Sequence, residues 1–128
     1  MQNTEAIEAN KAVLRGLLDQ VYKKGNVDLI DRYFAEHVIN HVSSAGGSQD
    51  PHWGAQQQKD YLIKAFENLK DWKVEYDEPI AERDKVAVRW TFSGTQKDTN
   101  ETFGVIHQFI YRISEGKIVE VWHCWQAL

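Results

Sequence analysis

The sequence predicts one α+β domain, because helical and strand periodicities occupy different halves of the chain. Apolar residues recur at helical spacing as far as about residue 69, and from Trp72 onward apolar and polar residues alternate as they do in strands. The length of 128 residues suits a single domain, spanning residues 1–128, that can bury a core. We therefore expect three N-terminal helices packed on a mostly antiparallel sheet.

The first two helices are predicted from the residues at their ends. Thr4 can cap a helix that continues to Gly25, where the glycine supplies a natural stop. Asn26 can cap a short second helix over "VDLIDRYF". The next stretch, "EHVINHV", is too short for a helix, so we expect it to be extended.

The third helix is predicted to follow a loop rich in glycine and serine, "SSAGGSQDPHWG". Asp50 and Pro51 provide a cap and a first-turn proline, and helical spacing continues to about Leu69. The apolar stripe of this helix should be buried against the rest of the domain. It comprises Tyr61, Leu62, Ala65, Phe66 and Leu69.

The second half of the chain predicts strands with apolar faces. "WKVEY" and "VAVRWTF" each place aromatic and β-branched residues on one side, including Tyr76 and Trp90. The long segment "TFGVIHQFIYRISEGKIVEVWHCW" predicts a hairpin around the two-residue turn Glu115-Gly116.

Counting outward from this turn gives the predicted register of the hairpin. Gln108 faces His123 on one side of the sheet, and His107 faces Cys124 on the other, where we expect packing or an interface. A bulge that slips the register would exchange these two pairs. Both faces of the hairpin are apolar, so we expect one face to meet the helices and the other to meet a second subunit in a homodimer.

Composition excludes several classes of partner. The net charge of −4 is modest and the basic residues are dispersed, so we expect no binding to nucleic acid. No apolar run approaches the length of a membrane span, and the first residues do not resemble a signal peptide. A single cysteine, Cys124, rules out an internal disulfide and suits a reducing cytoplasm.

The segment "VEVWHCWQAL" is the least usual stretch of the chain, because it holds His123 and Cys124 between Trp122 and Trp125. An imidazole does not suit a strand buried in a plain core, and tryptophans do not suit a solvated tail. Since tryptophans often line apolar pockets or interfaces, this strand is a candidate wall of a ligand pocket.

Three segments carry a resemblance to a known family: "KGNVDLIDRYFAEHVINH", "DKVAVRWTFSGT" and "YRISEGKIVEVW". In this order they resemble the SnoaL-like polyketide cyclases of the nuclear-transport-factor-like superfamily. The resemblance covers essentially the whole chain. It implies a cone, in which a curved sheet wraps an apolar pocket that the helices close and in which a small hydrophobic carbonyl compound binds.

The resemblance also implies a reaction and its catalytic group. Cyclases of this family close a ring by an intramolecular aldol step without a metal or cofactor. They use as acid and base an aspartate that follows the tryptophan of the last strand. In this chain the matching position is His123, after Trp122, and this is a departure from the family pattern.

His123 is therefore the first catalytic candidate, since an imidazole titrates near neutral pH. The alternative is that His123 only forms a hydrogen bond within an apolar wall. His41 is the second candidate, because it lies in the "NH" of the family, near the rim of the pocket, where it would contact substrate, contact His123, or hold the short strand in place. Gln108, on the same predicted face as His123, would orient substrate.

The remaining site predictions concern aromatic residues. We expect Trp53 to form a lid at the junction of loop and helix, Tyr61 to belong to the helical wall, and Tyr76, Trp90 and Trp125 to line the pocket from the strands.

A zinc site at His41, His107 and His123 is not expected, because they lack close ligand spacing and the hairpin histidines are predicted to point apart. The sequence thus leaves three functions open: a cyclase or isomerase, a binding protein without turnover, and a dimeric interaction module.

Overall fold

The computed structural model describes residues 4–42 and 52–128 and has the predicted α+β architecture. Helix α1 (Thr4–Gly16) continues directly into a π-helical segment, η1 (Leu17–Tyr22), and a 3-10 helix, η2 (Val27–Arg32), follows. Strand β1 (Phe34–Val42) then precedes helix α2 (Ala55–Glu67). The stretch predicted to be extended is therefore a strand, and it lies between the second and third helical regions.

The predicted end of the first helix agrees with the structure, whereas the predicted start of the third helix differs from it. Gly25 has φ 74°, a conformation that glycine adopts without strain. Helix α2 begins only after Gly54, whose backbone N–H donates to the Gln57 side chain at 3.0 Å. The predicted cap and proline, Asp50 and Pro51, lie outside the described residues.

The second half of the chain forms most of the sheet. Strands β2 (Leu69–Tyr76), β3 (Ile80–Glu82), β4 (Lys85–Gln96), β5 (Thr102–Ser114) and β6 (Lys117–Ala127) follow in order. The order across the sheet is β1-β6-β5-β4-β2, with β3 paired to β4. All pairings are antiparallel except that of β1 with β6, so the sheet is mostly antiparallel, as predicted.

The predicted turn of the β5–β6 hairpin is confirmed, but its predicted register is wrong beyond the first pairs. Glu115 and Gly116 have φ 52° and 77°, as a tight two-residue hairpin turn requires. Arg112 pairs with Glu120 and not with Val119, so two residues of β6 lie opposite one residue of β5.

This one-residue shift changes the side-chain faces, because neighbouring residues of a strand point to opposite sides. His107 now lies opposite Trp125, and Gln108 lies opposite Cys124. His123 lies opposite Phe109. His107 and His123 therefore share one face of the sheet, whereas Gln108 and Cys124 share the other.

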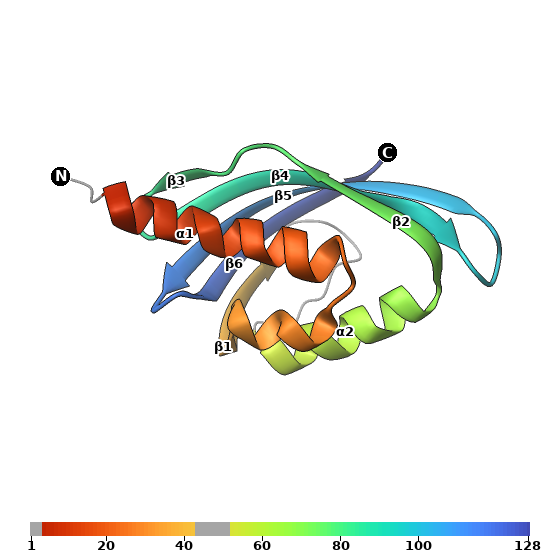
Figure 1. Ribbon diagram of the computed structural model, residues 1–128, viewed down its shortest axis with the longest axis horizontal. Coiled ribbons are helices and arrows are strands. Elements are labelled where there is room, and N and C mark those ends of the chain that lie inside the picture. Colours follow the sequence, from red (N-terminus) through yellow and green to blue (C-terminus); the bar gives the residue numbers. More distant parts are fainter. Residues whose placement is uncertain (1–3, 43–51) are drawn as a thin grey trace.

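The sheet curves around the helices, which all lie on its concave side (Figure 1). The apolar faces of α1, η1 and α2 pack on this side, and the convex side carries no helix of the described chain. None of the helices described is long and apolar enough to cross a membrane. The largest fully buried side chains include Tyr111, Leu14, Leu17, Leu18 and Ile30.

Candidate functional site

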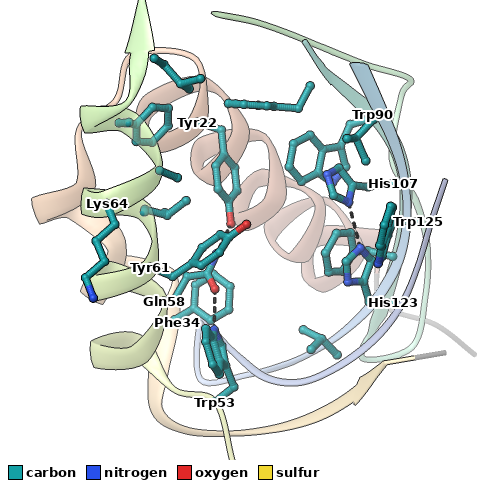
Figure 2. A pocket seen from close by; sticks show the side chains of 18 of the residues that line it. Tyr22, Phe34, Trp53, Gln58, Tyr61, Lys64, Trp90, His107, His123 and Trp125 are labelled. Atoms are coloured by element: carbon teal, nitrogen blue, oxygen red, sulfur yellow. Dashed lines mark hydrogen bonds between the residues drawn. The ribbon is translucent and has the colours of Figure 1, made fainter. Parts of the chain in front are cut away.

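A cavity of about 600 Å³ lies between the concave face of the sheet and the helical wall of η1 and α2. Figure 2 shows these two walls with their aromatic side chains directed toward the space between them. Among the described residues that line the cavity there is no aspartate or glutamate, and Lys64 is the one charged side chain. The cavity is therefore a largely apolar chamber of the size that holds a small organic ligand.

Two histidines form the main polar group of the sheet wall. His107 Nδ1 and His123 Nε2 lie 2.9 Å apart, within hydrogen-bonding distance (Figure 2). The one-residue shift in the hairpin brings them together, because it places both rings on the concave face of adjacent strands. The prediction that the hairpin histidines point apart is therefore wrong.

Aromatic rings hold both imidazoles in place. His123 stacks on Phe109 with the ring centroids 3.9 Å apart and an interplanar angle of 6°. His107 stacks on Trp90 with the centroids 4.3 Å apart. Among the described residues neither imidazole has a carboxylate partner, so no negative charge from this part of the chain offsets the cost of burying a positive charge at the pair.

Burial therefore lowers the pKa of both histidines. Desolvation and, as the smaller cause, the neighbouring His123 together lower the pKa of His107 from 6.5 to about 4. Desolvation likewise lowers the pKa of His123 from 6.5 to about 4. Both rings are neutral at pH 7, so one donates and the other accepts the shared hydrogen bond.

A neutral histidine pair of this kind can move a proton. Whichever ring donates, one of the two outer ring nitrogens, His107 Nε2 and His123 Nδ1, is bare and the other carries a proton. The bare nitrogen can accept a proton from a ligand, and the shared hydrogen bond can then pass a proton along the pair. The second ring stabilises the imidazolium that forms, because hydrogen bonds to charged groups are stronger.

The helical wall presents a second hydrogen-bonded group. Trp53 Nε1 donates to Gln58 Oε1 at 2.6 Å, and Gln58 Nε2 donates to the Tyr22 hydroxyl oxygen at 2.8 Å. Tyr22 is buried and stacks on Trp90, with the ring centroids 5.0 Å apart. Burial raises the pKa of Tyr22 well above its usual value, so the phenol keeps its proton at neutral pH.

Most of the aromatic residues predicted for the site do line the cavity. Trp53 and Tyr61 contribute from the helical wall, Trp90 and Trp125 from the strands, and His123 lies among them. Tyr61 is 57% exposed, so it stands at the mouth of the cavity rather than in the buried stripe predicted for its helix.

Gln108 and Tyr76 do not line the cavity. Gln108 is exposed on the convex face, opposite Cys124, because of the register shift. The Tyr76 hydroxyl donates to Asp19 at 2.9 Å between β2 and η1, and burial and Asp19 together raise the pKa of Tyr76 to about 12.

His41 also lies on the convex face, away from His123. It pairs with Trp122 in the register of β1 and β6, and its ring stacks on that indole with the centroids 5.2 Å apart. His41 Nε2 lies 2.8 Å from Glu120 Oε2, and the other carboxylate oxygen, Glu120 Oε1, accepts from Arg112 Nε at 2.9 Å. Asn40, and not His41, is the member of the "NH" pair that lines the cavity.

Sequence reasoning missed His107 and Gln58 as members of the site. The predicted register places His107 on the wrong face. Its true face depends on the irregularity in the hairpin, which the sequence does not reveal. Gln58 carries no signal in the sequence beyond one polar residue on an amphipathic helix. Within residues 4–42 and 52–128, no group of three or more His, Cys, Asp or Glu is placed to hold a metal ion.

The family model described as SnoaL-like polyketide cyclase matches residues 12–128, which is nearly the whole chain. The chain belongs to this family. The match agrees with the nuclear-transport-factor-like fold, the helices on the concave face and the cavity beneath the sheet. The position where the family resemblance places an aspartate holds His123, hydrogen-bonded to His107.

Solved structures of low sequence identity share this fold. A proposed polyketide cyclase from Acidithiobacillus ferrooxidans has a TM-score of 0.77 at 16% identity, over 98% of this chain and 92% of that one. IdmH, a proposed polyketide cyclase from Streptomyces antibioticus, has a TM-score of 0.75 at 18% identity, over 91% of each chain.

A third similar structure is AclR, a proposed hydroxylase from Streptomyces galilaeus. Its TM-score is 0.70 at 16% identity, over 95% of this chain and 76% of that one. No curated protein matches the sequence significantly. Because proteins assigned to different reactions share the fold, the site itself has to indicate the chemistry.

Proposed function

We propose that the protein is a cofactor-independent cyclase or isomerase that acts on a small hydrophobic carbonyl compound. The observation that carries this proposal is the hydrogen-bonded pair of neutral histidines in an apolar cavity. The described lining offers no carboxylate, so an imidazole is the available base. His123 occupies the position of the family's acid and base, and His107 supports it.

The reaction begins with removal of a proton from the carbon next to the carbonyl group. The C–H bond breaks, the bare imidazole nitrogen takes the proton, and the electron pair moves onto the carbonyl oxygen as an enolate. A general base with a pKa of about 4.6 performs this step in a ketosteroid isomerase, so a pKa near 4 is compatible with it.

The second step decides between the two reaction types. In an isomerase the imidazolium returns its proton to another carbon of the same enolate. In a cyclase the enolate carbon attacks a second carbonyl of the same molecule, and the alkoxide formed takes the proton from the imidazolium. Both steps restore the neutral histidine pair, and neither consumes an oxidant or a reductant.

Exchange of the acidic protons of β-tetralone for deuterium tests this proposal without knowledge of the natural substrate. β-Tetralone is a small bicyclic ketone with acidic protons next to its carbonyl, and loss of their NMR signal in D₂O reports proton removal. We expect the wild type to accelerate exchange and His123→Gln to lower the rate by about 100-fold, a typical contribution of a general base.

Gln108→Leu is the matched control, because Gln108 lies on the convex face and does not line the cavity. It should exchange β-tetralone at the wild-type rate. If His123→Gln exchanged β-tetralone at the wild-type rate, His123 would not be the base. Binding without acceleration by the wild type would instead favour a binding protein without turnover, because a base contributes to turnover far more than to affinity.

The third alternative, a dimeric interaction module, predicts that the protein's own rings fill the cavity. A cavity of about 600 Å³ favours a ligand instead.

We also infer that the convex face of the sheet joins two copies of the chain. No described helix covers this face (Figure 1), and it exposes 47% of Ile39 and 43% of Ile110. Sedimentation analysis should give a dimer for the wild type and a monomer for Ile110→Glu; a monomeric wild type at micromolar concentration would contradict the inference.

A further inference from the structure

The hydrogen-bond chain on the helical wall has only one possible direction. An indole N–H can only donate, so the Gln58 atom 2.6 Å from Trp53 Nε1 must be the carbonyl oxygen. The Gln58 amide nitrogen therefore faces Tyr22 at 2.8 Å. Because an amide nitrogen only donates, the Tyr22 oxygen must act as the acceptor.

This direction leaves the hydroxyl proton of Tyr22 unused. In the hydrogen bonds of the described residues, Tyr22 accepts from Gln58 and donates to no side chain. The phenol stays protonated at neutral pH, because burial raises the pKa of Tyr22. The wall therefore carries a fixed O–H donor that a ligand in the cavity can use.

Tyr22 is also positioned relative to the proposed base. Tyr22 is 5% exposed and its ring stacks on Trp90, and Trp90 in turn stacks on His107. Figure 2 shows Trp90 between Tyr22 and His107, with the Tyr22 hydroxyl directed toward Gln58 on the helical wall. Tyr22 and both histidines line the same cavity, so a ligand in it can meet a donor from the helical wall and a base from the sheet.

We propose that Tyr22 donates the hydrogen bond that binds the carbonyl oxygen of the ligand, and that Trp53 keeps this donor free by fixing the orientation of Gln58. Tyr22 then stabilises the enolate oxygen that forms when the histidine pair removes the neighbouring proton. Gln58 and Trp53 are positioning residues, because they act through Tyr22. The proposal rests on the proposed function for its class of ligand, an enolisable ketone.

The affinities of β-tetralone and tetralin provide the test, because tetralin has the same bicyclic carbon skeleton without the carbonyl oxygen. Isothermal titration of each compound into the protein gives the ratio of the two affinities. We expect the wild type to prefer the ketone about tenfold, the ratio expected for one hydrogen bond to a ligand. Tyr22→Phe should lower the ratio to about one, since it removes only the hydroxyl group.

Two further variants separate positioning from simple packing. Trp53→Phe frees the Gln58 amide to turn its oxygen toward Tyr22, which then donates to Gln58 instead of to the ligand, so the ratio should also fall to about one. Adding Gln58→Leu to Trp53→Phe removes that competing acceptor and should restore a preference for the ketone. A packing defect would not be rescued by a second substitution.

Tyr76→Phe is the control, because it removes a phenol outside the cavity, and it should keep the wild-type ratio. A wild-type ratio near one, or a ratio that Tyr22→Phe leaves unchanged, overturns the proposal while the proposed function stands. Failure of both compounds to bind the wild type contradicts the ligand class and overturns the proposed function with it.

Discussion

Acidification from pH 7 to pH 5 should destabilise the protein through its two buried histidines. His107 and His123 are neutral in the folded state because burial lowers the pKa of each from 6.5 to about 4. Between these values the unfolded chain binds more protons than the folded chain, so the free energy of unfolding falls as the pH falls. Their full contribution to stability is present above about pH 6.5 and is lost toward pH 4.

The magnitude follows from the shifts of the two histidines. Each unit of pKa corresponds to about 1.36 kcal/mol, so lowering the pH from 7 to 5 would cost about 4 kcal/mol for the pair if both shifts were fully expressed. Both rings are partly exposed, and solvent screening reduces this value. We expect a loss of about 2 kcal/mol from the pair.

Urea denaturation at pH 7, 6 and 5 measures this loss, with the double variant His107→Gln and His123→Gln as the comparison. The wild type should lose about 2 kcal/mol more than the variant over this range. The paired carboxyls Asp84 and Glu120 do not interfere, because arginine contacts lower their pKa values and their contribution is lost only at more acidic pH. Parallel pH profiles for wild type and variant would refute the buried, neutral state of the histidines.

Three further predictions concern stability and packing. A Cβ on Gly54 would lie 1.7 Å from the Glu36 carbonyl oxygen, so Gly54→Ala should cost about 3 kcal/mol or more; an unchanged melting temperature would contradict this close approach. Glu115 has φ 52° in the hairpin turn, so Glu115→Asn should stabilise the fold by about 0.5 kcal/mol in urea denaturation, and destabilisation would argue against the turn. Phe109 stacks on His123, so Phe109→Ala should cost about 3 kcal/mol and also slow β-tetralone exchange, whereas an unchanged exchange rate would show that the ring does not hold the imidazole.

The fold was predictable from the sequence because its signals are local and repeated. The change of period at Trp72, the stop at Gly25 and the turn at Glu115-Gly116 each depend on neighbouring residues alone. The start of α2 was less predictable, since Asp50 and Pro51 are a strong helix signal and the helix nevertheless begins only at Ala55. Local capping preferences are weak beside tertiary packing, which sets where such a helix begins.

The site was only partly predictable, because its polar residues depend on strand register. One irregularity near Arg112 places His107 in the cavity and Gln108 outside it. No residue in the hairpin predicts that irregularity. The parallel pairing of β1 with β6 similarly places Asn40 inside and His41 outside. The aromatic lining was easier to predict, since large rings favour buried or half-buried positions whichever strand carries them.

The pair of histidines replaces a charged base with a neutral one. A carboxylate in an apolar chamber carries a negative charge before the reaction, whereas His107 and His123 are uncharged until they accept a proton. The second ring then shares the positive charge through the hydrogen bond between His107 Nδ1 and His123 Nε2. An uncharged cavity of this kind suits a neutral ketone better than an anionic ligand.

The pH dependence of β-tetralone exchange tests the central claim most directly, because it reports the protonation state of the base during the reaction. The base acts in its neutral form, so the catalysed rate should rise as the pH is raised through about 4 and should be constant from about pH 5 to 8. His123→Gln should abolish this profile. A catalysed rate that instead rises through pH 6.5, or a profile unchanged in His123→Gln, would contradict the assignment of the buried histidine pair as the base.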